Sequence, residues 1–226
     1  MVLAGGKGER LHPLTLHRAK PAVPFGGKYR IIDYTLSNCL NSGLRKIAVL
    51  IQYKSYSLDR HIRTAWNIFN PELGEFIASV PPQQRISEDW YRGTADAVHQ
   101  NLFLLDNEHS DYLLVLAGDH IYKMNYADMY ETLISQHADA VVGAIECPLE
   151  EASRFGVISV DPQYRITHFD EKPERPTPLP NDPTKAFGSM GIYLFKTDII
   201  RDHLVRDAKE GGAHDFGKNI LPRMIQ

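Results

Sequence analysis

The fold is decided by the stretch Leu3-Ala4-Gly5-Gly6-Lys7-Gly8-Glu9-Arg10-Leu11, in which apolar residues run into a loop with glycines at positions 5, 6 and 8. Glycine lacks a Cβ atom, so the backbone can approach a ligand closely and turn its N–H groups toward it. Lys7, Arg10, Arg18 and Lys20 add positive charge, and such a loop suits a polyanion such as a nucleoside triphosphate. An ordinary glycine-rich turn with solvated charges has the same pattern, and the loop alone does not separate the two.

Two well-known phosphate-binding motifs are excluded at this loop. The pattern G-x-x-x-x-G-K-[ST] is absent, and Leu11 stands where the dinucleotide fingerprint G-x-G-x-x-G needs its third glycine. The loop therefore indicates another kind of nucleotide site.

Length and composition fit one large α/β domain of 226 residues, with a hydrophobic content of 43%. A net charge of −3 argues against a bulk nucleic-acid or polybasic membrane surface, so phosphate affinity has to come from local groups of cations. The two cysteines, Cys39 and Cys147, lie in apolar surroundings and are expected to be reduced and buried. With no membrane-spanning run and no signal peptide, we expect a cytoplasmic protein.

Strand and helix patterns alternate along the chain, which predicts a Rossmann-like, mostly parallel sheet with helices on both faces. The expected helices are residues 31–42, 58–69, 94–105, 126–137, 197–205 and a short one near 216. The expected strands are residues 46–52, 75–80, 112–117, 140–146, 155–160, 165–170 and 189–195.

The clearest strand, residues 112–117, runs directly into Gly118 and Asp119. Ligands of open α/β sheets bind beyond the carboxyl ends of the strands, so we expect Asp119 on the same edge as the glycine loop. There it would be a Mg²⁺ ligand, since Mg²⁺ takes one or two carboxylates together with phosphate oxygens. A helix-capping or turn aspartate is the alternative.

Three further places carry candidate ligand contacts. Tyr91 precedes Gly93 and Thr94 at the start of a helix, where an aromatic ring could face a base or a sugar. Glu171 and Lys172 end a strand and could bind sugar hydroxyls and a phosphate, although a surface charge pair has the same appearance. Glycines also occur in predicted strands, at Gly156 and on both sides of Ser189. They could admit a ligand, or they could mark β-bulges.

Taken together, these stretches resemble the ADP-glucose pyrophosphorylase family, also called glucose-1-phosphate adenylyltransferases. The resemblance runs in order from end to end of the chain and is carried by Leu3–Leu11, Arg18–Pro24, Phe25–Asp33, Leu36–Asn38, Ser42-Gly43, Pro82–Arg85, Trp90–Ala97, Ala117–Tyr122, Glu171–Pro173, Ser189–Tyr193 and His214–Gly217. All sugar-nucleotide pyrophosphorylases share the glycine loop, whereas residues 90–97 and 189–193 point to the ADP-glucose branch.

The resemblance implies a nucleotide-diphospho-sugar transferase fold and the reaction of ATP with glucose 1-phosphate to give ADP-glucose and pyrophosphate, with Mg²⁺ as cofactor, for glycogen or starch synthesis. Arg10, Lys20 and Asp119 would be catalytic, and Asp119 would hold the metal. Matching positions for glucose 1-phosphate are Tyr91, Gly156, Glu171, Lys172 and Ser189. Matching positions for the nucleotide are Leu3, Ala4, Gly5, Gly6, Lys7 and Gln84.

Departures from the family pattern concern the far end of the chain and its regulation. Residues 1–226 match the nucleotidyltransferase catalytic domain, so the family's β-helix domain and its second metal-binding aspartate are expected beyond this sequence. The resemblance also implies a homotetramer and control by sugar-phosphate or nucleotide effectors. His17 stands where enteric members carry an activator-binding lysine, which leaves the effector open.

Two alternative functions are open. One is a pyrophosphorylase that uses another nucleotide or sugar phosphate, such as a UTP or dTTP enzyme. The other is a regulatory subunit that binds substrates with little catalysis, against which the intact Lys7, Arg10, Asp119 and Lys172 argue.

Overall fold

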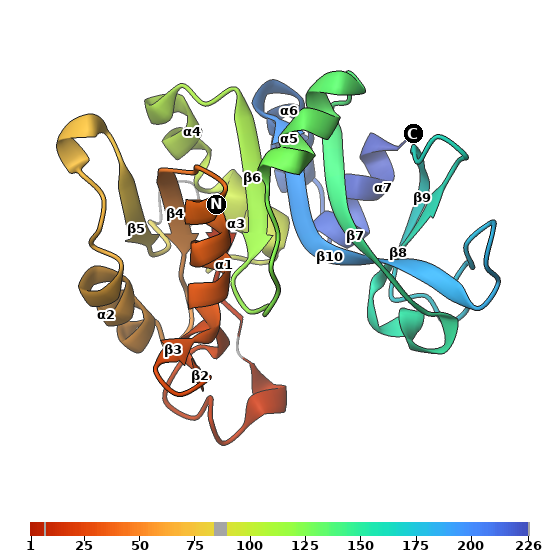
Figure 1. Ribbon diagram of the computed structural model, residues 1–226. Coiled ribbons are helices and arrows are strands. Elements are labelled where there is room, and N and C mark those ends of the chain that lie inside the picture. The colour runs from red at the N-terminus through yellow and green to blue at the C-terminus, as the bar shows by residue number, and fades with distance from the viewer. Residues whose placement is uncertain (7, 84–89, 226) are drawn as a thin grey trace. The chain divides into compact units, whose positions relative to one another are not determined.

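The structure, a computed structural model, describes residues 1–6, 8–83 and 90–225 of the protein (Figure 1). The chain forms two compact units, each built from two separate stretches. The first unit consists of residues 1–91 and 114–138, and the second unit of residues 92–113 and 139–226.

The strands of the first unit are parallel, in the order β5 (Phe76–Val80), β4 (Lys46–Leu50), β1 (Val2–Leu3), β6 (Tyr112–Ala117). Val2 lies opposite both Val49 and Leu116, and these three side chains are at most 1% exposed. Leu3 lies opposite Ala117, so β1 and β6 end side by side. The loops that follow these two strands therefore begin at the same edge of the sheet.

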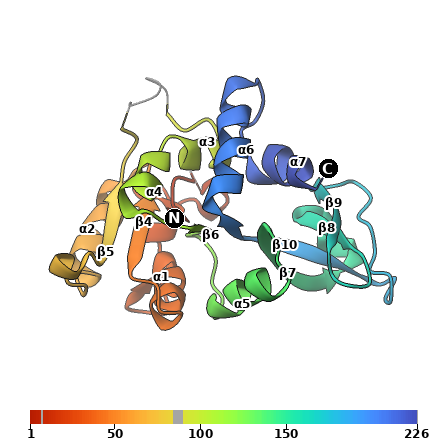
Figure 2. The same cartoon turned by 90° about the horizontal axis from the view of Figure 1, so that it is seen from above.

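Three helices belong to the first unit: α1 (Ile31–Asn41), α2 (Tyr56–Ala65) and α5 (Ala127–Ser135). Helix α1 lies against one face of the sheet, in front of β4 and β1 in Figure 1 and below β4 in Figure 2, and it buries Ile32 and Leu36 completely. Asp33 closes the start of this helix by accepting a hydrogen bond of 2.8 Å from the backbone N–H of Arg30. The same carboxylate accepts a 2.8 Å bond from the Trp66 indole N–H, which joins α1 to the end of α2.

Short elements fill the connections of the first unit. They are the 3₁₀ turns Glu9–Leu11, Lys20–Ala22 and Pro71–Leu73 and a small hairpin of β2 (Pro24–Phe25) with β3 (Tyr29–Arg30). The turns at 9–11 and 20–22 occupy the stretch between the glycine loop and Lys20, where the sequence predicts no regular element.

The second unit contains an antiparallel group of strands in the order β7 (Ala140–Pro148), β10 (Lys185–Lys196), β8 (Gly156–Val160), β9 (Ile166–Glu171). The register between β10 and β7 shifts between Ser189 and Ile192, where β10 has extra residues. Gly191 lies in this bulge with φ of 67°, a left-handed conformation that glycine adopts at little cost.

The helices of the second unit are α3 (Thr94–His99), α4 (Leu102–Glu108), α6 (Thr197–Lys209) and α7 (Leu221–Met224), and a π-helical turn at Phe216–Ile220 precedes α7. Tyr193, Phe195 and Phe216 pack together in the interior, with ring centroids 5.4 to 6.0 Å apart. A 3₁₀ helix at Leu149–Arg154 lies between β7 and β8.

The predicted α/β class with a mostly parallel, helix-flanked sheet is confirmed, and most predicted elements lie within a few residues of the observed ones. The single helix expected at residues 94–105 is wrong, because α3 ends at His99 and α4 begins at Leu102. Asn101 at the break donates its side-chain amide to the Ala97 carbonyl at 2.8 Å, so a side chain takes the place of the backbone donor there. No helix in the described part of the chain is long and apolar enough to cross a membrane.

Candidate active site

The glycine loop folds back onto the segment that carries Lys20. Gly8 has φ of 66°, and a Cβ atom at this position would lie 2.7 Å from the Cβ of Lys20 and 3.0 Å from Cγ2 of Thr15. The Thr15 hydroxyl donates a hydrogen bond of 2.9 Å to the Gly8 carbonyl. Both the backbone angle and the close contact require glycine at position 8.

Lys54 holds the other arm of this loop, a role that sequence reasoning missed. Its ammonium donates hydrogen bonds to the carbonyls of Thr15 at 3.1 Å and Leu16 at 2.7 Å. Because Thr15 in turn binds Gly8, Lys54 fixes the return path of the loop toward Lys20. No local pattern marks Lys54, since its partners lie 38 and 39 residues away.

Asp119 lies beside this loop, as expected from the position of its strand. Gly118 donates its N–H to the Leu3 carbonyl at 2.9 Å, which ties the end of β6 to the end of β1. The Lys20 ammonium donates to Oδ2 of Asp119 at 2.8 Å, and Nε2 of His120 lies 3.5 Å from Oδ1. With side-chain exposures of 26% for Lys20 and 33% for Asp119, this ion pair is accessible to a ligand.

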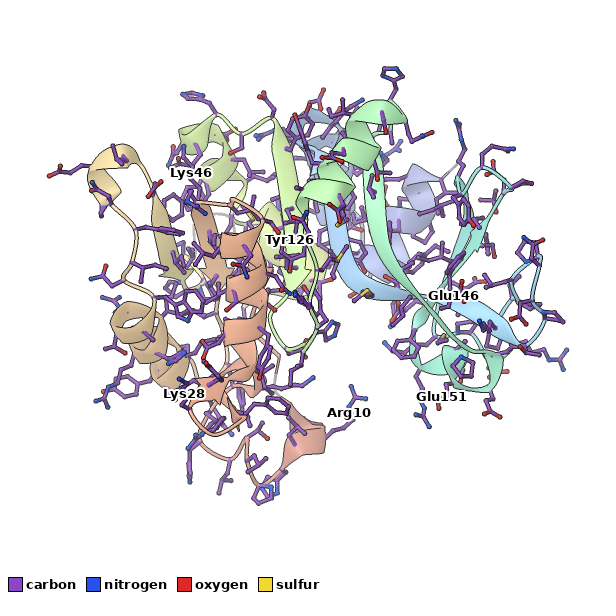
Figure 3. All side chains as sticks on the ribbon, in the orientation of Figure 1. Arg10, Lys28, Lys46, Tyr126, Glu146 and Glu151 are labelled. Carbon is purple, nitrogen blue, oxygen red and sulfur yellow. The ribbon has the colours of Figure 1, made fainter. Side chains whose placement is uncertain are left out.

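Other predicted residues of the first unit surround the same edge. Arg10 is exposed and extends from the turn at Glu9–Leu11 away from the ribbon (Figure 3). Ala4 donates its N–H to the Leu50 carbonyl at 2.9 Å, so the residues from Leu3 to Gly6 begin directly at the end of β1. Lys7 and Gln84 fall outside the described residues.

Gln52 connects the glycine loop to Tyr91. A Cβ atom on Gly5 would lie 3.1 Å from the Cβ of Gln52, and the Gln52 amide donates to the Tyr91 carbonyl at 3.5 Å. Tyr91, which we expected near the sugar phosphate, belongs to the first unit. Gln52 contacts both Tyr91 and Gly5 and so links Tyr91 to the glycine loop. Sequence reasoning placed Gln52 only at the end of a strand.

The second unit brings Glu171 and Lys172 together at the end of β9. Lys172 has φ of 53°, and its backbone N–H donates to the Phe155 carbonyl at 3.0 Å. Its ammonium lies 2.5 Å from Oε1 of Glu171, with side-chain exposures of 61% for the lysine and 19% for the glutamate. The pair therefore combines an accessible cation with a half-buried carboxylate.

Two glycines leave space around the other carboxylate oxygen of Glu171. A Cβ atom on Gly156 would lie 3.0 Å from Oε2 of Glu171 and 2.4 Å from the Phe169 ring, and one on Gly217 would lie 2.5 Å from the same Oε2. Glu171 accepts no hydrogen bond at Oε2 from any residue that the structure describes. Glycine at positions 156 and 217 therefore allows this carboxylate to pack closely against the backbone.

Ser189 and Tyr193 lie on the neighbouring strand β10, with their oxygens 3.5 Å apart. Burial raises the pKa of Tyr193 to about 12, the Ser189 hydroxyl opposes this shift, and the negative charges of Asp215 and Glu171 add to it. Tyr193 therefore stays a neutral hydrogen-bonding phenol within electrostatic reach of Glu171.

Asp215 organises the segment that carries Gly217. Its carboxylate accepts hydrogen bonds from the backbone N–H groups of Gly217 at 2.9 Å and Lys218 at 3.2 Å, and from the Thr94 hydroxyl at 2.9 Å. The sequence signal for this residue was the stretch His214–Gly217, to which no role was assigned.

The predicted residues thus gather in two groups. The first unit holds Leu3, Ala4, Gly5, Gly6, Arg10, Lys20, Tyr91 and Asp119, and the second unit holds Gly156, Glu171, Lys172 and Ser189. Across the described ranges there is no group of three or more His, Cys, Asp or Glu side chains that could hold a metal ion by itself. Within the described residues, a metal at Asp119 would thus lack a cluster of such side chains, and its further ligands would come from elsewhere.

Comparison with known proteins gives a family and named relatives. A family model described as nucleotidyl transferase matches residues 1–226. Glucose-1-phosphate adenylyltransferase 2 of Vibrio vulnificus strain YJ016 is 55% identical over 226 residues, which cover 100% of this chain and 56% of that protein. The glucose-1-phosphate adenylyltransferase of Rhodopirellula baltica is 54% identical over all of this chain, which covers 51% of that protein. The one of Hydrogenovibrio crunogenus is 53% identical over all of this chain, which covers 54% of that protein. The chain spans about half the length of these curated relatives.

Proposed function

The chain belongs to the nucleotidyl transferase family, and we propose that it transfers AMP from ATP to glucose 1-phosphate, which gives ADP-glucose and pyrophosphate. Support comes from the names of the relatives, which are glucose-1-phosphate adenylyltransferases. The observation that carries the proposal is the Lys20–Asp119 pair beside the glycine loop, because it combines a cation and a carboxylate where a triphosphate would enter.

The cations of the first unit serve the departing pyrophosphate. Lys20 lies within reach of the loop, and Arg10 is exposed and makes no hydrogen bond or ion pair to any described residue. Positive charge at these positions stabilises the negative charge that develops on the leaving group. Lys7, Gln84 and the backbone of Leu3–Gly6 complete the proposed nucleotide contacts.

Asp119 is the proposed Mg²⁺ ligand. The donor set fits this ion, since a single accessible carboxylate completed by phosphate oxygens is its usual coordination in nucleotide sites. When bound, the ion neutralises charge on the phosphates and orients them. Lys20 neutralises Asp119 in the free protein, and with a metal on Asp119 its ammonium would be available to phosphate oxygens.

The second unit supplies the proposed contacts to glucose 1-phosphate. Lys172 binds the phosphate, because its ammonium is the more exposed member of the pair with Glu171. Glu171 accepts hydrogen bonds from sugar hydroxyls, and Gly156 and Gly217 allow its carboxylate to lie where it does. Ser189 of the same unit is proposed to line the sugar as well, and so is Tyr91, which belongs to the first unit.

The reaction needs no covalent intermediate. A phosphate oxygen of glucose 1-phosphate attacks the α-phosphorus of ATP, the bond to the β-phosphate oxygen breaks, and pyrophosphate leaves with the electron pair. Catalysis consists of holding the two substrates in line and of neutralising charge, which is typical of phosphoryl-group transfer.

A nucleotide screen tests this proposal. The protein is incubated with glucose 1-phosphate, Mg²⁺ and either ATP, UTP or dTTP, and released pyrophosphate is measured. We expect release with ATP at a rate at least about tenfold above the other two, a difference of about 1.4 kcal/mol. Preference for UTP or dTTP would establish the alternative pyrophosphorylase. Substrate binding without release, by a chain that also carries the expected second metal-binding aspartate, would establish a regulatory subunit.

A further inference from the structure

A buried acid–imidazole pair in the second unit has no part in the proposed chemistry. Asp207, at the end of α6, and His214, in the following loop, are both 3% exposed. Nδ1 of His214 lies 2.8 Å from Oδ2 of Asp207. A carboxylate can only accept, so Nδ1 carries the proton and donates.

His214 adopts a backbone conformation that its side chain has to sustain. Its φ of 50° lies in the left-handed region, where a residue with a Cβ atom is strained. Its carbonyl accepts hydrogen bonds from Ala95 N–H at 2.8 Å and Asp96 N–H at 3.3 Å, in the first turn of α3. Strain of this kind persists where surrounding contacts enforce it, and the bond to Asp207 is such a contact.

The loop could not approach α3 without a glycine there. A Cβ atom on Gly93 would lie 2.2 Å from the Ala213 carbonyl oxygen and 2.3 Å from that of His214. Both neighbours are backbone atoms, so they cannot move aside as a flexible side chain would. The position of His214 is therefore fixed from two sides, by Asp207 through its ring and by α3 through its carbonyl.

The residues after His214 lead directly to Glu171. Asp215 accepts a hydrogen bond from the Thr94 hydroxyl at 2.9 Å and caps the π-helical turn that begins with Phe216, through a 2.9 Å bond from the Gly217 N–H. The Cα of Gly217 stands so close to Glu171 that an added Cβ would lie 2.5 Å from Oε2. Two residues of chain, Asp215 and Phe216, thus separate His214 of the buried pair from Gly217, which lies against Glu171.

Asp207 is itself well anchored. Nη1 of Arg223 forms an ion pair with its Oδ1 at 3.6 Å, longer than a hydrogen bond, and Nη2 of the same guanidinium lies 2.6 Å from Oε2 of Glu210. The acid therefore joins α6, the loop and α7, and it gives His214 a fixed acceptor.

We propose that His214 is a positioning residue for the sugar-phosphate subsite. Its bond to Asp207 holds the left-handed backbone that places Gly217 against Glu171, and it touches no substrate. What Glu171 binds rests on the proposed function, whereas the position of the loop does not.

Three variants distinguish the effect of the hydrogen bond donated by the ring from the effect of the left-handed backbone conformation. His214→Asn keeps a donor close to the place of Nδ1 and tolerates the left-handed conformation, whereas His214→Gly keeps only the backbone freedom. His214→Leu loses both. KM for glucose 1-phosphate and for ATP, with kcat, is measured for each folded variant.

We expect His214→Gly and His214→Leu to raise KM for glucose 1-phosphate about tenfold or more and to change KM for ATP less than about twofold. His214→Asn should restore KM for glucose 1-phosphate to within about threefold of the unaltered protein. Equal changes in both KM values, or no rescue by Asn relative to Gly, would overturn the proposal.

Hydrogen exchange gives a readout that does not depend on the reaction. The amides of Ala95, Asp96 and Gly217 should exchange about tenfold faster in His214→Gly than in His214→Asn. If the unaltered protein transfers no nucleotide but this difference is found, the proposed function fails and the positioning of the loop stands. Equal exchange in the two variants would reject the positioning role whatever the activity.

Discussion

The ammonium of Lys20 lies 2.8 Å from the carboxylate of Asp119, although 99 residues separate them in the sequence. A partly exposed ion pair of this kind contributes only about 0–1 kcal/mol to folding. Its residues can therefore be exchanged without unfolding the protein, and the pair is best explained by what it binds.

Replacement of Asp119 tests the metal site. We expect Asp119→Asn to lower kcat about a hundredfold or more, because charge neutralisation at the phosphates is lost, and to leave KM for glucose 1-phosphate nearly unchanged. Steady-state kinetics at saturating Mg²⁺ measure this. Asp128→Asn is the matched control, because Asp128 is exposed and its carboxylate accepts a hydrogen bond of 2.7 Å from the Asn125 amide. An unaltered kcat in Asp119→Asn would remove the assignment.

Replacement of Lys172 tests the phosphate contact. Lys172→Ala should raise KM for glucose 1-phosphate about ten- to a hundredfold, since a charge-assisted hydrogen bond is lost, with little change in KM for ATP. Lys185→Ala removes a lysine of the same unit that is paired with Glu146 at 3.0 Å and should leave both values unchanged. A rise confined to KM for ATP would contradict the role.

The two loop glycines, Gly8 and Gly6, should behave differently. Gly8→Ala places a Cβ 2.7 Å from that of Lys20 at φ of 66°, so we expect the free energy of unfolding to fall by about 1 kcal/mol or more. A Cβ on Gly6 meets nothing within 4 Å, so Gly6→Ala should keep its stability and weaken ATP binding alone. Denaturant titration and nucleotide titration measure the two effects. Equal stability of the two variants would show that the loop is not packed as described.

Gly217 provides a test of the space beside Glu171. Gly217→Ala should displace the Glu171 carboxylate, because the new Cβ would lie 2.5 Å from Oε2, and raise KM for glucose 1-phosphate. Gly211→Ala is the control, since a Cβ there meets nothing within 4 Å. Indistinguishable kinetics of the two variants would show that this space takes no substrate.

Cys39 should make the protein less stable in alkali. Burial raises the pKa of this thiol from 9.0 to about 12. The unfolded chain releases the proton first, so the free energy of unfolding falls as pH rises from about 9 to about 12, by at most about 1.4 kcal/mol per pH unit for this group. Urea titrations of the unaltered protein and Cys39→Ala under reducing conditions compare the slopes. Parallel slopes would count against a buried neutral thiol.

Much of the fold could be predicted because its signals are local. The apolar run 112–117 followed by Gly118 and Asp119 indicates both a buried strand and an acid at its carboxyl end, and the structure has both. In the same way, the glycines of the first loop and the helical spacing after Arg30 were sufficient for β1 and α1, but not for the short turns and the hairpin between them.

What could not be predicted depends on contacts across loops. Lys54 binds carbonyls 38 and 39 residues away, and no pattern around it differs from that of a solvated lysine. The bond of His214 to Asp207 spans a loop whose path is set by Gly93, far away in the sequence. The break between α3 and α4 depends on the Asn101 side chain, which donates a hydrogen bond to a backbone carbonyl. The helical spacing of apolar residues continues through this break, so the sequence pattern did not reveal it.

The left-handed backbone at Lys172 has a practical consequence for redesign. In a regular strand, neighbouring side chains face opposite sides, but φ of 53° at this position brings the lysine and the preceding glutamate together. The positions of the two side chains are therefore coupled. Exchanging either residue alone, in order to alter the acceptor preference, would also displace the side chain of the other. Libraries aimed at new acceptors should vary positions 171 and 172 jointly and allow asparagine or glycine at the second.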